Sequence, residues 1–264
     1  MVLRLREFPE SRMNVLVVDI GGNNIKVLAT GETDRRKSPS GPNLTPRQMV
    51  ASVKAMTKDW TYDVVSIGYP GPVKDGRPAA EPHNLGKGWV GFDFERAFGH
   101  PVRVINDAAM QALGSFEAGT MLFLGLGTGL GSCLIVQGKI APLELAHLPY
   151  KKATYEHYVG RRSLDLRGRK RWSKEVAEVI SLFSMAIRPD EIVLGGGNAR
   201  KLSVLPKGCR LGNNGNAFLG GFRLWEDPTA PRRKIQNSIG KSTERKASPP
   251  KPRKRPSQNQ SPAA

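Results

Sequence analysis

Two α/β lobes with a cleft between them are the fold that this sequence predicts, and three observations carry the prediction. Strand-like and helix-like segments alternate through both halves of the 264-residue chain, as they do where helices cover sheets. Each half also contains a glycine-rich turn between two apolar runs, at residues 21–24 and 125–132. The length is enough for one large or two small domains with a real core. We expect an N-terminal extension at 1–12, a small lobe at 13–115, a large lobe at 116–226 and a tail at 227–264.

In the first lobe, apolar runs predict four strands, near residues 15–20, 25–30, 63–68 and 102–105. A helix is expected to run from about Thr45, an N-cap residue followed by Pro46 at the first helical position, to Lys58. A second, short helix follows Asp107. Residues 31–44 and 74–90 are expected to be loops.

In the second lobe, strands are expected near residues 121–125, 131–136 and 191–194, with Gly138 in a hairpin turn. A helix is expected over roughly 172–187, where apolar residues recur at helical spacing. A final element is expected at 216–225. We find no internal repeat at a short period.

Composition and charge narrow the class of protein. With 39% hydrophobic residues and 29 glycines, the chain suits a turn-rich α/β enzyme. No apolar run reaches transmembrane length, and residues 1–12 lack the apolar core of a signal peptide. Cys133 and Cys209 are the only cysteines, which excludes a disulfide framework. We expect a cytoplasmic protein with no membrane partner.

The net charge of +18 is concentrated toward the C-terminus. From Asp227 to Ala264 there are ten Lys or Arg residues against two acidic ones, which leaves +10 for the first 226 residues. This tail is rich in Pro, Ser, Lys and Arg and lacks aromatic residues, so we expect it to be disordered. It favours solubility or nonspecific attraction to polyanions, and no specific nucleic-acid partner is expected.

The first glycine-rich turn, in the run VLVVDIGGNNIK at 15–26, is suited to a hairpin that lies against phosphate. Gly21 and Gly22 have no Cβ, so backbone N–H groups can approach phosphate oxygens closely. Asp19 stands at the end of the buried strand, where a carboxylate can hold a hydrated magnesium ion. An ordinary hairpin turn is the commoner reading of this stretch alone.

Between the two turns, the run PVRVINDAAMQALG at 101–114 delivers two polar residues from a strand to the start of a helix. The Asp107 carboxylate can act as a general base there. Asn106 beside it can both donate and accept hydrogen bonds with a hydroxyl group. Asp107 also suits a helix N-cap, and the two roles can coexist.

The second glycine-rich turn, in MLFLGLGTGLGSCLI at 121–135, could clamp a phosphoryl chain together with the first. Its spacing is neither that of a P-loop nor that of a dinucleotide fingerprint. PLELAHL follows at 142–148, with Glu144 and His147 three residues apart. Such a pair can bind vicinal hydroxyls, although a lone pair at this spacing is more often surface or core filler.

In this order, the four blocks resemble the ROK family of sugar kinases, within the actin-like/hexokinase ATPase fold. DIGGNNIK resembles the first phosphate motif, VINDA the catalytic Asn-Asp, LGLGTGLGS the second phosphate motif and LELAH the sugar contact ExGH. IGYPGPV and EPHNLGKGW resemble sugar-side loops, and VLGGG a nucleotide-side turn. The similarity covers about residues 13–226 and is closest to the short polyphosphate glucokinases. It implies ribonuclease H-like lobes with a cleft between.

The resemblance also implies a role for each matching residue. Asp107 would be the catalytic base, and Asp19 would hold Mg²⁺ through water. The sugar would be bound by Asn84, Asn106, Glu144, His147 and Glu156. Phosphate contacts would come from Asp19, Gly21, Gly22, Asn23, Asn24, Lys26, Gly127, Thr128 and Gly129, and nucleotide-side contacts from Gly195, Gly196 and Gly197. A homodimer is left open.

Three departures from the family pattern affect this interpretation. The chain has no cysteine between residues 134 and 208, where longer members carry a zinc-binding segment, so no structural zinc is expected. Ala146 stands where the family has glycine, which bears on the geometry of His147. Asn23 replaces the usual Thr or Ser and keeps a donor without the hydroxyl.

A basic run after the sugar contact is the strongest indication of the phosphoryl donor. A line of cations suits polyphosphate, which presents repeated negative charge, better than ATP, although a solvated basic face is as good a reading. The run comprises Lys151, Lys152, Arg161, Arg162, Arg167, Arg169, Lys170, Arg171 and Lys174. The short, zinc-free layout also resembles that of the polyphosphate-using members, and this resemblance implies a glucokinase that uses polyphosphate and perhaps ATP. The alternatives are an ATP-dependent kinase for another hexose or amino sugar, and a non-catalytic sugar- or polyanion-binding protein.

Overall fold

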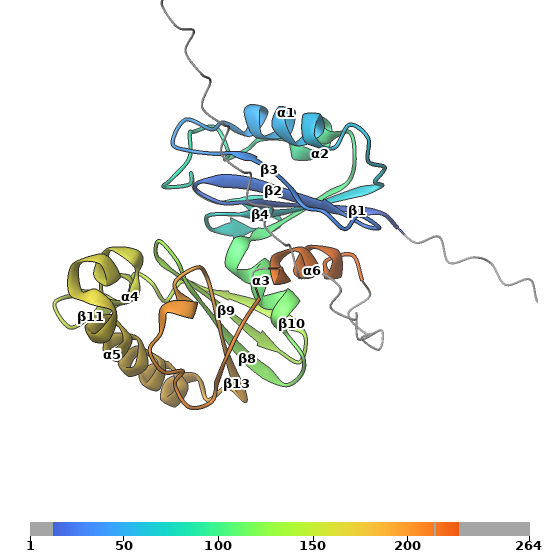
Figure 1. Cartoon of the computed structure of the whole chain (residues 1–264). Helices are drawn as coiled ribbons and strands as arrows, with labels where there is room; N and C mark the ends of the chain where they lie inside the picture. Colours follow the sequence, from blue (N-terminus) through green and yellow to red (C-terminus); the bar gives the residue numbers. More distant parts are fainter. Residues whose placement is uncertain (1–12, 214, 227–264) are drawn as a thin grey trace, which may run out of the picture. The chain divides into compact units, whose positions relative to one another are not determined.

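The computed structural model describes residues 13–226, apart from residue 214, and two five-stranded mixed sheets dominate them (Figure 1). The expected N-terminal extension, 1–12, and tail, 227–264, lie outside the described residues. None of the helices described combines the length and apolar character needed to cross a bilayer.

The first sheet has the strand order β3-β2-β1-β4-β7. Its strands are β1 (Val15–Ile20), β2 (Asn24–Ala29), β3 (Arg36–Pro39), β4 (Val64–Tyr69) and β7 (Val102–Asn106). Strand β1 is antiparallel to β2 and parallel to β4, which is parallel to β7. The register aligns Asp19 with Gly68 and Tyr69 with Asn106. Asp19 and Asn106 therefore stand at the same edge of the sheet, at the carboxyl ends of parallel strands.

The second sheet has the order β10-β9-β8-β13-β14. Its strands are β8 (Thr120–Leu126), β9 (Leu130–Val136), β10 (Lys139–Leu143), β13 (Glu191–Gly195) and β14 (Cys209–Leu211). The β8–β9–β10 meander is antiparallel, whereas β13 is parallel to both β8 and β14. The register pairs Gly195 with Gly125, so the predicted nucleotide-side turn begins beside the second glycine-rich turn.

Alternating side chains bury both faces of each sheet. On β1, Leu16, Val18 and Ile20 join the core beneath α1 (Pro46–Met56) and α2 (Phe94–Phe98). Val15 and Val17 lie on the other face and pack with side chains of α3 (Asp107–Ser115) and α6 (Asn216–Arg223). On β8, the leucines face α4 (Tyr155–Val159) and α5 (Arg161–Ile187), while Met121 and Phe123 face α3. This period of two is that of strands covered on both faces.

Helices α3 and α6 pack directly against each other, backbone against backbone. A Cβ on Gly114 would lie 1.8 Å from the carbonyl oxygen of Asn216, and one on Gly220 would lie 1.8 Å from that of Met110. The boundary predicted at 115/116 assigns α6 to the second lobe by chain order. Its side chains Ala217 and Phe218 instead pack with β1 of the first sheet.

The expected strands and both expected first-lobe helices are present, and Thr45 is the N-cap of α1 as predicted. Gln48, which was not predicted to take part, completes a capping box with Thr45. The expectation of uninterrupted loops was wrong, because β3 lies within 31–44 and the hairpin of β5 (Val73–Lys74) and β6 (Arg77–Pro78) reaches into 74–90. The basic helix begins at Arg161, earlier than predicted, with a break at Gly168. Other short elements were not predicted either, among them the helices α2 and α4, the strands β11 (Pro149–Tyr150), β12 (Ala153–Thr154) and β14, and the 3-10 turn η1 (Ala199–Lys201).

Candidate active site

The first glycine-rich turn joins β1 to β2 and holds a charged pair. Asp19 and Lys26 are opposite each other in the strand register, and Lys26 Nζ donates to Asp19 Oδ2 at 3.0 Å. The N–H of Gly21 donates to the carbonyl of Asn24 at 2.9 Å and closes the turn. Asp19 is only 8% exposed. Because a buried carboxylate needs positive charge beside it, this position suits a cation.

A sugar-side loop lies against this turn. The Cβ of Asn84 is 3.5 Å from the position that a Cβ on Gly22 would occupy. Asn23 is exposed at the tip of the turn, and its carbonyl accepts from the N–H of Ser40 at 3.0 Å. The fold thus places Asn84 beside the predicted phosphate turn, although it lies 60 positions after Asn24, the last residue of that turn, in the sequence.

Asn106, rather than Asp107, is the N-cap of α3. Its Oδ1 accepts from the N–H groups of Ala108 and Ala109 at 3.0 and 3.2 Å, and its Nδ2 donates to the carbonyl of Gly71 at 3.0 Å. The alternative reading of Asp107 as the N-cap residue is therefore wrong. Asn106 ties the start of α3 to the PGPV loop, which fixes the orientation of the residue that follows it.

Asp107 is the first residue of α3, and its environment disfavours ionisation. Burial is the main cause that raises the pKa of this carboxyl to about 7, and the charge of Asp19 adds to it. The N–H of Ala108, which donates to Asp107 Oδ1 at 2.8 Å, opposes the shift, and Glu144 contributes a smaller increase. A carboxylate with a pKa near neutral is well matched to general-base catalysis.

The second glycine-rich turn is closed by residues that follow β13. Within the turn, the N–H of Gly127 donates to the carbonyl of Gly129 at 3.1 Å. The side-chain amide of Asn198 donates to the carbonyl of Gly127 at 2.8 Å. Gly196 has φ +79°, and a Cβ there would lie 2.4 Å from the carbonyl oxygen of Leu126. The turn at 195–197 and Asn198 are thus packed against the second glycine-rich turn.

Glu156, on the short helix α4, reaches the same turn. Its Oε2 accepts from the N–H of Leu130 at 3.3 Å, and a Cβ on Gly129 would lie 2.0 Å from that oxygen. The N–H of Glu156 donates to the carbonyl of Ala146 at 3.0 Å. Ala146, the departure from the family glycine, is buried and lies between the two predicted sugar contacts, Glu144 and His147, both exposed.

Part of the predicted basic run makes ion pairs and hydrogen bonds with other residues of the chain. Lys151 pairs with Glu175 and Glu178, Arg161 with Asp165, and Arg167 with Glu175, while Arg169 donates to the carbonyls of Lys201 and Leu202. Within residues 13–226, the remaining side chains are exposed and have no polar partner: Lys152, Arg162, Lys170, Arg171 and Lys174. These five, rather than all nine, can meet a polyanion without breaking an internal contact.

Asn198 was not predicted as a site residue, yet it holds the second glycine-rich turn from a position 71 residues later in the chain. Its N–H donates to the carbonyl of Leu126 at 2.9 Å, in addition to the side-chain bond described above. The available signal was an asparagine directly after three glycines at a strand end, a position that favours local backbone contacts.

A cavity of about 810 Å³ lies beside the edge strand β7, and most of the residues that line it are not predicted site residues. Of the predicted site residues, Asn106 lines it, together with apolar side chains such as Phe92, Val104 and Ile140. Because Asp107 is outside this lining, the active site is assigned from the polar geometry around α3 and the two turns.

Comparison with known proteins agrees with this arrangement. The model of the ROK family matches residues 15–142, which include the first turn, Asp107 and the second turn. The chain therefore resembles the ROK family over 128 of its 264 residues. A polyphosphate glucokinase from Mycobacterium tuberculosis is 29% identical over 208 residues, which cover 70% of this chain and 77% of that relative.

Solved structures confirm the two-lobed fold expected for this chain. The inorganic polyphosphate/ATP-glucomannokinase from Arthrobacter sp. strain KM has a TM-score of 0.70 at 23% identity, over 80% of this chain and 97% of that one. A ROK family glucokinase from Streptomyces griseus, in complex with glucose and AMPPNP, has a TM-score of 0.63 at 16% identity, over 80% and 98%.

Proposed function

We propose that the protein is a magnesium-dependent glucokinase that transfers a phosphoryl group from polyphosphate, and less efficiently from ATP, to the 6-hydroxyl of glucose. The observation that carries the proposal is Asp107, a half-buried carboxylate with a pKa of about 7 at the start of α3. It is electrostatically coupled to Asp19 at the first turn and to Glu144 after β10. Likeness to the polyphosphate glucokinase supports the choice of sugar and donor.

In the proposed reaction, Asp107 accepts the proton of the sugar hydroxyl as its oxygen bonds to the terminal phosphorus. The bond between that phosphorus and the bridging oxygen breaks, and the shortened donor leaves with the charge. Lys26 and the backbone N–H groups of the two glycine turns stabilise the phosphate oxygens. Glu144, His147, Glu156, Asn84 and Asn106 are proposed to hold the sugar hydroxyls.

The residues at the first turn fit a magnesium ion. Asp19 and Asp107 are acidic side chains close enough for one to raise the pKa of the other, and this repulsion is relieved by a cation. Asp19 would hold Mg²⁺ through water, and the ion would neutralise charge on the phosphate chain. We propose no structural zinc, since Cys133 and Cys209 lie on different strands, β9 and β14.

The second candidate is an ATP-dependent kinase for another hexose or an amino sugar. It is favoured by the internal pairing of Lys151, Arg161, Arg167 and Arg169, which leaves a shorter basic surface for a polymer. ATP needs fewer cations than polyphosphate, so the remaining five would suffice for it.

A donor and sugar assay tests both candidates. Purified protein with Mg²⁺ and glucose is expected to form glucose 6-phosphate faster with polyphosphate than with equal phosphate equivalents of ATP. Activity should vanish with EDTA and return with Mg²⁺, and metal analysis should find less than one zinc per chain. Turnover with ATP alone would favour the second candidate, whereas no sugar phosphate from any hexose with either donor would overturn the kinase proposal.

A further inference from the structure

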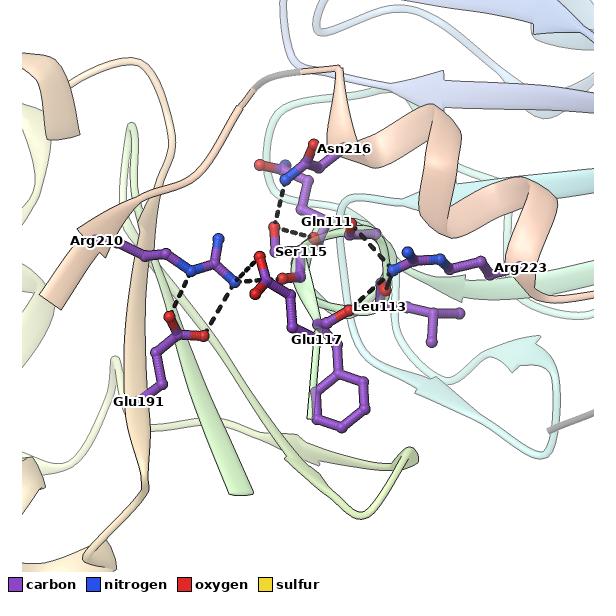
Figure 2. Close-up of polar contacts among 10 residues, drawn as sticks. Gln111, Leu113, Ser115, Glu117, Glu191, Arg210, Asn216 and Arg223 are labelled. Atoms are coloured by element: carbon purple, nitrogen blue, oxygen red, sulfur yellow. Dashed lines mark hydrogen bonds and ion pairs between the residues drawn. The ribbon is translucent and has the colours of Figure 1, made fainter. Parts of the chain in front are cut away.

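The C-terminal end of α3 is held by side chains from two other elements (Figure 2). This helix begins at Asp107 and ends at Ser115, and its C-cap residue Phe116 is extended. The last carbonyls of a helix have no partner within it and must find one elsewhere. In α3, two arginines supply those partners.

Arg223 and Arg210 divide these carbonyls between them. Arg223, on α6, donates to the carbonyl of Leu113 at 2.7 Å and also to those of Gly114 and Phe116. Arg210, on β14, donates to the carbonyl of Ser115 at 2.6 Å. Positive charge at a helix C-terminus is also favourable to the helix dipole.

Glu191, at the start of β13, fixes the direction of the Arg210 side chain. Arg210 Nε lies 2.5 Å from Glu191 Oε1, and its Nη2 lies 3.0 Å from Oε2. Glu117 Oε1 also lies 3.5 Å from Arg210 Nη2 (Figure 2). A two-pronged arginine–carboxylate pair sets both the position and the plane of the guanidinium group.

The two sides of α3 differ in how firmly they hold the helix. Met110 packs with the first sheet and α6, whereas the side toward the second sheet buries three small residues, Ala108, Ala109 and Ala112, beside the larger Leu113. Small side chains make shallow ridges, so this side defines the position of α3 along its axis less well. Because α3 and α6 are in backbone contact at Gly114 and Gly220, the two helices behave as one pair. Arg223 lies within this pair, whereas Arg210 connects the pair to the second sheet.

We propose that Arg210 is a positioning residue for Asp107, because it anchors α3 to the sheet that carries Glu144 and the 127–129 turn. This inference rests on the proposed function. When the anchor is removed, α3 can shift relative to the second sheet, and Asp107 at its other end is displaced from the reacting hydroxyl. A displacement of about 1 Å is enough to reduce turnover by up to 10²-fold.

The chain offers a closely matched control in Arg36 of the first sheet. Arg36 pairs with both oxygens of Asp59, at 2.5 and 2.8 Å, and donates to the carbonyl of Met56 at the end of α1. The side chains of Arg36 and Arg210 are 36% and 32% exposed. Each arginine thus pairs with a carboxylate and donates to a carbonyl at a helix C-terminus, one on α1 and one on α3. They differ in that Arg36 also lies over the ring of Trp60, whereas Arg210 also approaches Glu117.

The test compares Arg210→Met, Arg210→Lys and Arg36→Met in the full chain. Arg210→Met is expected to lower kcat by about tenfold or more, with the glucose KM within about twofold of wild type. Amide exchange should accelerate in α3. Arg36→Met should accelerate exchange in α1 and leave kcat unchanged, although both Met variants lose similar thermal stability. Arg210→Lys, which keeps the charge without the planar fork, should fall between wild type and Arg210→Met.

Two results would overturn the inference. One is a wild-type kcat in Arg210→Met, or in Arg210→Lys if the Met variant does not fold. The other is a fall in kcat that Arg36→Met reproduces, since general loss of stability would then explain both. An inactive wild type would instead overturn the proposed function, and the exchange of α3 in Arg210→Met would still report whether the anchor exists.

Discussion

At the scale of the residue, most of the proposed chemistry depends on one carboxylate, that of Asp107. The N-cap role is taken by Asn106, which leaves the Asp107 carboxylate to face Asp19 and Glu144. Asp107→Asn is expected to lower kcat by about 10²-fold or more while sugar binding is nearly retained, because the amide cannot accept the proton. Steady-state kinetics and calorimetric titration with glucose check this. Turnover within a few-fold of wild type would mean that Asp107 is not the base.

The pKa of Asp107 also predicts how activity depends on pH. A general base must be ionised to act, and the pKa of this carboxyl is raised to about 7 by burial and by Asp19. Below that pH, kcat/KM for the sugar should fall about tenfold per pH unit, as the protonated fraction rises. A pH series at saturating donor measures it. An acid limb with its midpoint near pH 4, where an ordinary Asp titrates, would contradict the environment described here.

Glu156 and Gly129 form a second pair whose function can be tested. A Cβ at position 129 would lie 2.0 Å from Glu156 Oε2, so Gly129→Ala should push this carboxylate away from the turn. If Glu156 binds the sugar, Gly129→Ala should raise the sugar KM by about tenfold, the value of one charged hydrogen bond. In a Glu156→Gln background the same change should cost less. Equal costs in both backgrounds would show that Glu156 plays no part in that effect.

At the scale of the element, the strands that carry the site could be predicted because each has an identifiable polar or glycine residue at its end or next to it. Asn106 and Gly195 are the last residues of their strands, and Asp19 is the last but one of β1. Strand β3 could not be predicted from apolar alternation, since its sequence RKSP is polar and it lies at the sheet edge. The five-residue helix α2 is too short to show a helical period.

The basic helix α5 shows how a charge run divides between structure and surface. Arg167 pairs with Glu175 and stacks on Tyr158, and Arg169 holds η1, so neither is suited to a donor test. We expect alanine at the four exposed α5 cations without partners to raise the polyphosphate KM much more than the ATP KM. These are Arg162, Lys170, Arg171 and Lys174.

A control for this variant removes the same charge elsewhere. Alanine at four exposed cations on other elements should leave both KM values near wild type if position matters, as the proposal requires. These are Arg47, Lys54, Lys74 and Lys139. Equal weakening of both donors by the α5 variant would show that α5 carries no polyphosphate track.

At the scale of the whole molecule, the pairing of α3 with α6 could not be predicted from the sequence. It depends on Gly114 and Gly220, which are far apart in the chain and have no side chain to signal a contact. Likewise, nothing in the sequence around Arg210 and Arg223 distinguishes these two arginines from the others in the chain. The two phosphate turns were recoverable because their glycines sit between apolar runs, whereas their contacts with Asn84, Glu156 and Asn198 arise only in the folded chain.

The distribution of net charge leads to the last prediction, because part of the +18 lies in residues 227–264 and part in residues 1–226. Polyphosphate that lies along α5 should release several counterions on binding, so its KM should rise steeply with salt, while the ATP KM rises less. Removing residues 227–264 should weaken polyphosphate binding uniformly and preserve the tighter binding of long chains over short ones. The four-residue α5 variant should instead flatten both the salt dependence and the chain-length preference. If removal of the tail alone abolished that preference, the tail would be the polyphosphate-binding segment, and α5 would be only a solvated basic face.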